Sequence, residues 1–144
     1  MADVCAAGAG GNLGEARAAA RVRSEEGTLD LVHGHSSHHP RPIEIYRDKL
    51  VLYGCGDFVT DYEGIGGYEE FRSDLCPAYL ARLETSAGKL EELRIAVPAG
   101  PVEASEGLER GLPVVERRTL RASRIFGTRV VPSKKGSLVV QARQ

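Results

Sequence analysis

The four histidines of this chain all fall within the seven-residue segment His33–His39. Histidine is the commonest metal ligand in proteins, and a neutral imidazole binds divalent ions near pH 7. His35 and His38 are separated by two small residues and follow Gly34, so both imidazoles could converge on one metal ion or on two adjacent ions. From the residues alone, a metal site and an exposed loop without function remain equally open.

Two imidazoles do not complete a metal site, because catalytic metals take about three protein ligands plus water, and di-metal sites need more. The nearest carboxylates in the sequence are Asp30, Glu44, Asp57 and Asp61. Asp57 ends the hairpin that returns from the histidine segment. It could orient a ligand histidine through a hydrogen bond, or it could simply cap the end of a strand.

The elements around the histidines are predicted to be strands. Residues 29–32 form an apolar run typical of a short buried strand, which would deliver the histidines at its carboxyl end, where α/β proteins place their chemistry. Residues 42–46 alternate apolar and polar, as in a half-buried strand, and residues 50–53 are continuously apolar, as in a strand covered on both faces. We expect the hairpin turn between them at Asp48-Lys49.

The remaining segments predict helices and two further strand pairs. Residues 15–26 favour a helix that Gly27 stops, and Pro113 fits the start of a helix that runs to about Arg124 and is broken by Gly127. The predicted strands are 79–84 with 90–97, around a turn at 85–89, and 128–131 with 137–140. Residues 61–77 form a long loop rich in glutamate and aromatic residues. We therefore expect an α/β protein with a mixed sheet and helices on one face.

Composition limits the function classes. A chain of 144 residues predicts one domain, and a net charge of −1 gives no field toward nucleic acid or acidic membranes. The four arginines near the C-terminus are interpreted as a solvated helix face. They are Arg117, Arg118, Arg121 and Arg124.

The cysteines, the apolar runs and the N-terminal residues bear on the cellular location of the protein. The cysteines Cys5, Cys55 and Cys76 are far apart, which argues against a disulfide framework and favours a reducing compartment. Cys55, between two glycines, is predicted to be a small packed thiol. No apolar run approaches the ~20 residues of a membrane span, and the N-terminus lacks a secretory signal. We expect a cytoplasmic protein with no membrane span.

Several short motifs in a fixed order resemble those of the CapA-type (capsule, poly-γ-glutamate synthesis) family of the calcineurin-like metallophosphatase superfamily. They are Gly-His-Ser-Ser-His at 34–38, Ile-Glu-Ile-Tyr at 43–46 and Leu-Tyr-Gly-Cys-Gly-Asp-Phe at 52–58, and the resemblance covers roughly residues 28–131. It implies that residues 28–144 are the C-terminal half of a four-layer α/β/β/α sandwich, preceded by a divergent segment, residues 1–27.

The same resemblance implies a di-metal centre of Mn, Fe or Zn type at the strand ends. His35 and His38 match the last metal-binding motif of that family, whereas His33, His39 and Asp57 would be additional or supporting residues. The activity implied is metal-dependent hydrolysis or transfer on a phosphoester-like or polyglutamate-related substrate.

Departures from the family pattern keep a second hypothesis open. The chain has no Asp-x-His segment, and Gly56-Asp57 with Asp61 imitates a second ligand motif only loosely, on the wrong side of the histidine loop. The chain could therefore be a catalytically inactive remnant or pseudoenzyme that acts, if at all, by binding. A third alternative is a metal-binding module that acts as a homodimer, in which the chains pair through an exposed sheet edge and each completes the other's site.

Overall fold

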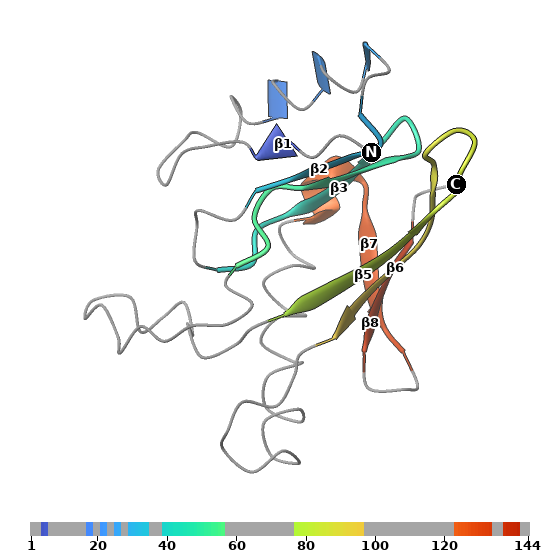
Figure 1. Cartoon of the computed structure of the whole chain (residues 1–144). Helices are drawn as coiled ribbons and strands as arrows, with labels where there is room; N and C mark the ends of the chain where they lie inside the picture. Colours follow the sequence, from blue (N-terminus) through green and yellow to red (C-terminus); the bar gives the residue numbers. More distant parts are fainter. Residues whose placement is uncertain are drawn as a thin grey trace.

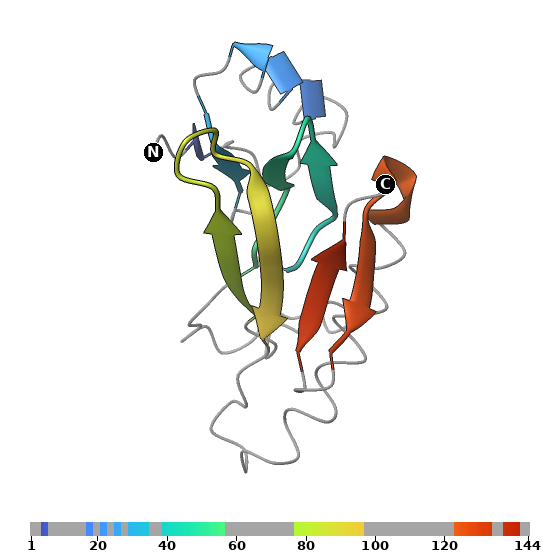
Figure 2. The ribbon, with the colours of Figure 1, turned by 90° about the vertical axis from the view of Figure 1, so that its right-hand side faces the viewer.

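The described part of the chain forms two four-stranded sheets that pack face to face (Figure 1, Figure 2). The structure is a computed structural model. It describes residues 4–5, 17–18, 21–22, 25–26, 29–34, 39–56, 77–96, 123–133 and 137–141. The first sheet is mixed and helical residues accompany the sheets, which is consistent with the predicted α/β class.

The first sheet has the strand order β1-β2-β4-β3. The strands are β1 (Val4–Cys5), β2 (Leu31–His33), β3 (Ile43–Tyr46) and β4 (Lys49–Leu52). β1, β2 and β4 run parallel, and β3 pairs with β4 in antiparallel register. The predicted strands are confirmed, although β2 begins two residues later than expected and includes His33. β1, two residues long, lies in the divergent N-terminal segment and forms one edge of this sheet.

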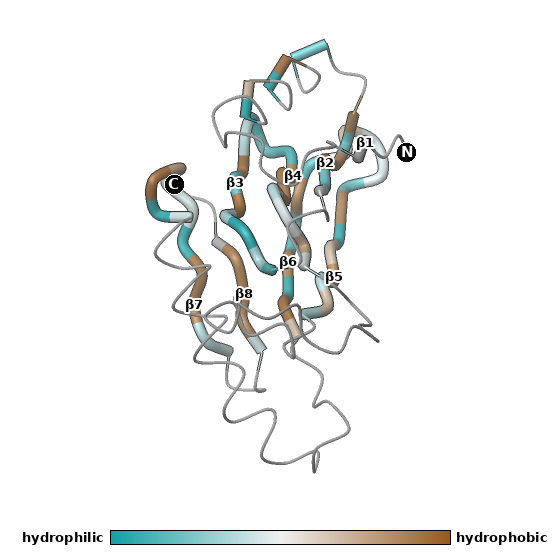
Figure 3. The backbone as a smooth tube through the Cα atoms, turned by 90° about the vertical axis from the view of Figure 1, so that its left-hand side faces the viewer, coloured by the Kyte–Doolittle hydropathy of each residue, from teal (hydrophilic) through white to brown (hydrophobic). Residues whose placement is uncertain are grey.

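The second sheet is antiparallel throughout, with the order β5-β6-β8-β7. Its strands are β5 (Ala78–Leu83), β6 (Leu90–Ala96), β7 (Arg129–Pro132) and β8 (Leu138–Gln141). Both predicted strand pairs are thereby confirmed. Figure 3 shows the hydrophobic stretches along β7 and β8.

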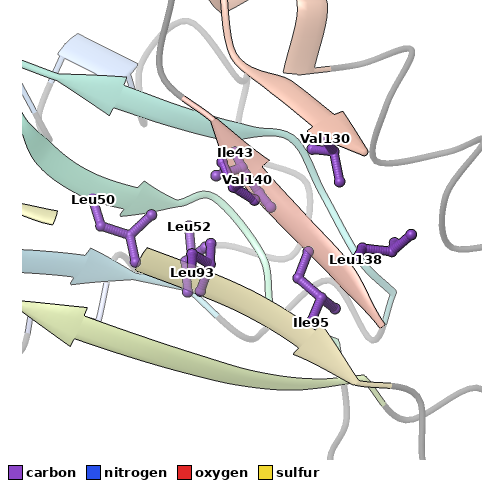
Figure 4. Close-up of a cluster of buried hydrophobic side chains, with 8 residues drawn as sticks. All are labelled: Ile43, Leu50, Leu52, Leu93, Ile95, Val130, Leu138 and Val140. Carbon is purple, nitrogen blue, oxygen red and sulfur yellow. The ribbon is translucent and has the colours of Figure 1, made fainter. Parts of the chain in front are cut away.

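The core lies between the two sheets, where inward-facing side chains of both meet (Figure 4). The buried members of this cluster are Ile43, Leu50, Leu52, Leu93, Ile95, Val130, Leu138 and Val140. The periodicity of the segments predicted one mixed sheet, whereas the structure has two sheets. The α/β/β/α sandwich that the family resemblance implies also has two β layers. Because each strand exposes alternate residues to opposite faces, the facing apolar sides of the two sheets bury each other. A second, smaller buried cluster in the first sheet is formed by Leu29, Val32 and Val51.

The first hairpin turns one residue earlier than predicted. Tyr46 pairs with Lys49, so the two turn residues are Arg47 and Asp48 rather than Asp48 and Lys49. Both have positive φ, 49° and 65°, as a two-residue turn that matches the twist of its strands requires. Aspartate tolerates this left-handed region better than most residues.

Helical structure is short in the described residues. Residues 17–18, 21–22 and 25 are helical, in agreement with the helix predicted for 15–26. A 3-10 helix, η2 (Arg124–Phe126), ends at Gly127, whose φ of 77° stops it as expected. The helix predicted from Pro113 lies outside the described residues, as do Arg117, Arg118 and Arg121. Among the described residues, no helix is both long and apolar enough to cross a membrane.

The outer edge of β3 is closed by two buried hydroxyl groups. The backbone N–H groups of Ile43 and Ile45 point away from β4, and unpaired edge groups invite pairing with other chains. Ile43 N donates to Ser123 Oγ at 2.9 Å, and Ile45 N donates to Thr128 Oγ1 at 3.2 Å. The η2 region therefore serves as a polar cover for this edge.

The two sheets are tied together beside the hairpin turns. Lys49 Nζ donates to Asp30 Oδ1 at 2.9 Å and also to the carbonyl oxygen of Ala87. Leu90 N donates to the carbonyl oxygen of Asp48 at 2.7 Å. These bonds join the first hairpin to the turn between β5 and β6.

Replacing Ser123 by alanine should destabilise the fold by about 1–3 kcal/mol, because the buried N–H of Ile43 would lose its acceptor. Ser86→Ala is the matched control, since Ser86 is exposed and its hydroxyl bonds the half-exposed Glu84. We expect it to stay within about 0.5 kcal/mol of wild type. Urea denaturation measures both, and equal effects of the two substitutions would contradict the prediction.

Gly88→Ala should cost more than about 1 kcal/mol, because Gly88 has a φ of 62° and a Cβ there would overlap the Asp30 carboxylate. Asp30 would have to leave Lys49. The neighbouring Ala87→Gly is the control, because it adds no atom at this junction. Thermal denaturation of both variants checks this, and a Gly88→Ala protein as stable as wild type would refute the account.

Candidate functional site

The histidine loop starts where β2 ends, at the carboxyl end of a strand with parallel neighbours on both sides. The N–H of Gly34 donates to the carbonyl oxygen of Leu52 at 2.9 Å. The N–H of Cys55 in turn donates to the carbonyl oxygen of Gly34 at 2.7 Å. The start of the loop is thus fixed to the end of β4.

The return of the loop is fixed to the same segment. Pro40 and Cys55 form an isolated antiparallel bridge, and Arg41 N donates to the carbonyl oxygen of Gly54 at 2.9 Å. Gly56 has a φ of 73°, and a Cβ there would lie 3.3 Å from Pro40 and from the carbonyl carbon of His39. A side chain at 56 would therefore crowd the end of the loop.

The predicted ligands are placed to different degrees. His35, His38 and Asp57 lie outside the described residues. His33 is half-buried at the end of β2 and pairs in register with Leu52, and His39 is half-buried at the return of the loop. The described residues on the two sides of the histidine segment, Gly34 and Arg41, therefore both bond to the segment 52–55 that precedes Asp57.

Two of the carboxylates considered from sequence are engaged elsewhere. Asp30 forms an ion pair with Lys49 beside the start of β2, away from the histidine loop, and that hydrogen bond lowers the pKa of the Asp30 carboxyl. Glu44 bonds to arginines and a tyrosine. Within the part of the chain that the structure describes, no three histidine, cysteine or acidic side chains gather as a metal site would require.

Glu44 is a buried carboxylate with hydrogen bonds from three other side chains. The sequence had predicted only a half-buried strand at this position. The Glu44 side chain is 3% exposed. Arg17 donates to both carboxylate oxygens at 3.2 Å, Arg21 donates to Oε1 at 2.8 Å, and the Tyr53 hydroxyl donates to Oε2 at 2.5 Å. We call these four residues the Glu44 cluster.

The electrostatics of the Glu44 cluster favour an ionised carboxylate. Burial acts to raise the pKa of Glu44, but the hydrogen bonds from Tyr53, Arg21 and Arg17 outweigh it and hold the pKa below its usual range. Burial, and then the bond to Glu44, raise the pKa of Tyr53, so its hydroxyl remains a donor. A charged acceptor and a neutral donor form a strong hydrogen bond.

Aromatic rings support the two arginines. The guanidinium of Arg17 lies 4.5 Å from the ring centre of Phe126, and that of Arg21 lies 4.5 Å from the ring centre of Tyr46. The rings of Tyr53 and Phe126 are 5.3 Å apart at a tilt of 41°. The outer face of the first sheet is therefore covered by stacked arginines and aromatic rings, which explains why Glu44 is buried there.

The sequence contained a partial signal for the Glu44 cluster. Arg17 and Arg21 are four residues apart in a predicted helix, so they share one face. Nothing local to the sequence says that this face meets the polar side of β3. Cys55 behaves as predicted, since it packs half-buried against the core between the sheets.

Comparison with known proteins agrees with the motif reading. A family model described as bacterial capsule synthesis protein matches residues 12–62, which include the whole histidine segment. Two relatives, from Mycobacterium tuberculosis strains CDC 1551 and H37Rv, are each 45% identical to the chain over 127 residues. Both are named "probable polyglutamine synthesis accessory protein".

The alignment covers a larger share of this chain than of its relatives. The alignment covers 85% of this chain but 33% of each relative, so the chain spans about a third of the length of the curated relatives it matches. This coverage fits a C-terminal portion of such a protein. The resemblance to the CapA-type family of capsule and polyglutamate synthesis proteins is thereby confirmed.

Glu44→Gln should lower the free energy of unfolding by about 2 kcal/mol at pH 7, because two part-buried arginine contacts would lose their counter-charge. Glu91→Gln, which removes an exposed pair with Arg82, should change it by less than about 1 kcal/mol. Denaturant titration of both variants provides the measurement.

The pH dependence should follow the depressed pKa of Glu44. A carboxyl with a lowered folded-state pKa stabilises fully above its unfolded pKa of about 4.3 and loses that contribution as pH falls through the folded-state value. The stability difference between wild type and Glu44→Gln should therefore shrink below about pH 4. A difference that stays constant down to pH 2 would contradict this.

Proposed function

We propose that this CapA-like chain supplies the histidine-bearing part of a divalent-metal centre of the metallophosphatase type. The centre would perform metal-dependent hydrolysis or transfer in capsule or polyglutamate synthesis. One observation carries the proposal. Both ends of the segment that holds His35 and His38 are bonded to residues 52–55, at the carboxyl end of a parallel strand.

The proposed roles follow the chemistry of the side chains. His35 and His38 would be the metal ligands, and Asp57 would orient one of them through a hydrogen bond. His33 and His39 flank the segment and would support it. When bound, a divalent ion of Mn, Fe or Zn type would supply Lewis acidity and an activated water for attack on the substrate.

The donor set fits such an ion in part. Two imidazoles with open positions suit a metal of this type, and a bridging carboxylate is the usual companion in di-metal sites. Asp30 and Glu44 cannot serve without giving up their present ion pairs. Ligands beyond His35 and His38 would have to come from residues other than these two.

The engagement of these two carboxylates favours a second candidate function. In that alternative, the chain is a catalytically inactive remnant or pseudoenzyme that keeps the sheets and acts only by binding. The absence of an Asp-x-His segment from the sequence supports it. The two candidates differ in metal stoichiometry and turnover.

Metal binding tests the proposal. The purified chain is titrated separately with Mn²⁺, Fe²⁺ and Zn²⁺ by calorimetry, and bound metal is counted by elemental analysis. We expect wild type to bind at least one ion per chain, and His35→Ala and His38→Ala each to weaken binding by at least about tenfold. Arg82→Ala, an exposed residue of β5, is the control that should leave binding unchanged.

Hydrolysis of a generic phosphodiester by the metal-loaded chain separates the two candidates. Metal-dependent turnover that is lost in His35→Ala supports the enzyme. Metal binding without turnover supports the binding-only alternative. A wild-type chain that binds none of the three ions would overturn the proposed metal centre.

A further inference from the structure

We propose that Tyr53, anchored by Glu44, is a positioning residue that holds both ends of the histidine loop in place. The inference depends on the proposed function in one respect, namely that the histidines of this loop bind a metal ion. The hydrogen bonds themselves belong to described residues on both sides of the loop. Tyr53 would not touch a metal ion or substrate and would act through the backbone.

The first step concerns the place of Tyr53 in the chain. The residue before it, Leu52, accepts the hydrogen bond of Gly34 at 2.9 Å, and the residue after it, Gly54, accepts that of Arg41 at 2.9 Å. The departing and returning ends of the histidine loop are therefore attached to the two peptide neighbours of Tyr53. A shift of this residue would move both attachments together.

The second step concerns what fixes Tyr53. Its backbone N–H donates to the carbonyl oxygen of Pro42 at 3.2 Å, and its hydroxyl donates to Glu44 Oε2 at 2.5 Å. Its ring also contacts Phe126, with 5.3 Å between ring centres. The contacting residues are Pro42, just before β3, Glu44 in β3 and Phe126 in η2, so they come from separate segments of the chain. Of these contacts, the hydrogen bond from the hydroxyl is the directional one, so it determines the orientation of the Tyr53 side chain.

The third step concerns the rigidity of the anchor. Glu44 lies on β3 and pairs in register with Val51 of β4, so its backbone is part of the sheet. Arg17 and Arg21 hold its two oxygens from a helical segment. A carboxylate held by three partners has little rotational freedom left, so its bond to Tyr53 has a defined direction. Residues 17–21 are thereby linked to the histidine loop.

The chain offers a matched comparison in Tyr46. Its hydroxyl also bonds a glutamate, Glu25, at 2.5 Å, and its ring packs against Arg21, as the ring of Tyr53 packs against Phe126. Tyr46 lies next to the hairpin turn, at the opposite end of the β3–β4 pair from the histidine loop. Tyr53→Phe and Tyr46→Phe therefore remove the same atom at the two ends of one hairpin.

The experiment measures amide hydrogen exchange in the full chain without metal. In Tyr53→Phe, exchange at Gly34, Arg41 and Cys55 should accelerate about tenfold, the change produced by losing one hydrogen bond to a charged group. Exchange at the reference amides Leu90 and Ser133, bonded elsewhere, should stay within about twofold of wild type. Tyr46→Phe should leave the three loop amides unchanged.

A Mn²⁺ titration of the same three proteins gives the second readout. Tyr53→Phe should weaken binding by about tenfold, as expected for a group that orients ligands without binding the metal, and Tyr46→Phe should not. Faster exchange at the reference amides to the same degree as at the loop would mean general destabilisation and would overturn the inference. Unchanged loop amides in Tyr53→Phe would also overturn it. If the loop amides alone accelerate and wild type binds no Mn²⁺, the positioning role stands and the proposed metal centre fails.

Discussion

A buried carboxylate cannot stay charged without partners, and the arrangement around the first sheet follows from this constraint on Glu44. Its side chain is 3% exposed, and an unpaired charge at such a site would cost several kcal/mol. Arg17, Arg21 and Tyr53 supply the compensation from three places in the sequence. Satisfying one carboxylate therefore brings the helical segment, β3 and the end of β4 into fixed relation.

The two ends of the β3–β4 hairpin have different tasks. At the turn, Lys49 and Asp48 tie the first sheet to the second through Ala87 and Leu90. At the other end, residues 52–55 bond to Gly34 and Arg41 on the two sides of the histidine segment. The turn end ties the two sheets together, and the other end holds the two sides of the histidine segment at the carboxyl end of a parallel strand.

Local patterns predicted the strands well because their periodicity depends on neighbours in the sequence. The alternation at residues 43–46 and the turn residues near 47–48 are enough for a hairpin, and only its register slipped by one residue. The number of sheets was beyond such patterns. Ile43 and Leu93 belong to one buried cluster although they are 50 positions apart, and a pattern in either strand says only that one face is apolar.

The sequence by itself determined the strands, the clustering of four histidines between them and the resemblance to CapA-type proteins, because these depend on residue types and spacing. The tertiary structure decided that Glu44 is an anchor and unavailable as a ligand, that Ser123 covers an edge 80 residues away, and that Tyr53 joins the anchor to the loop. The physical reason is that burial and hydrogen-bond partnership arise between segments that meet only on folding, so no local pattern records them.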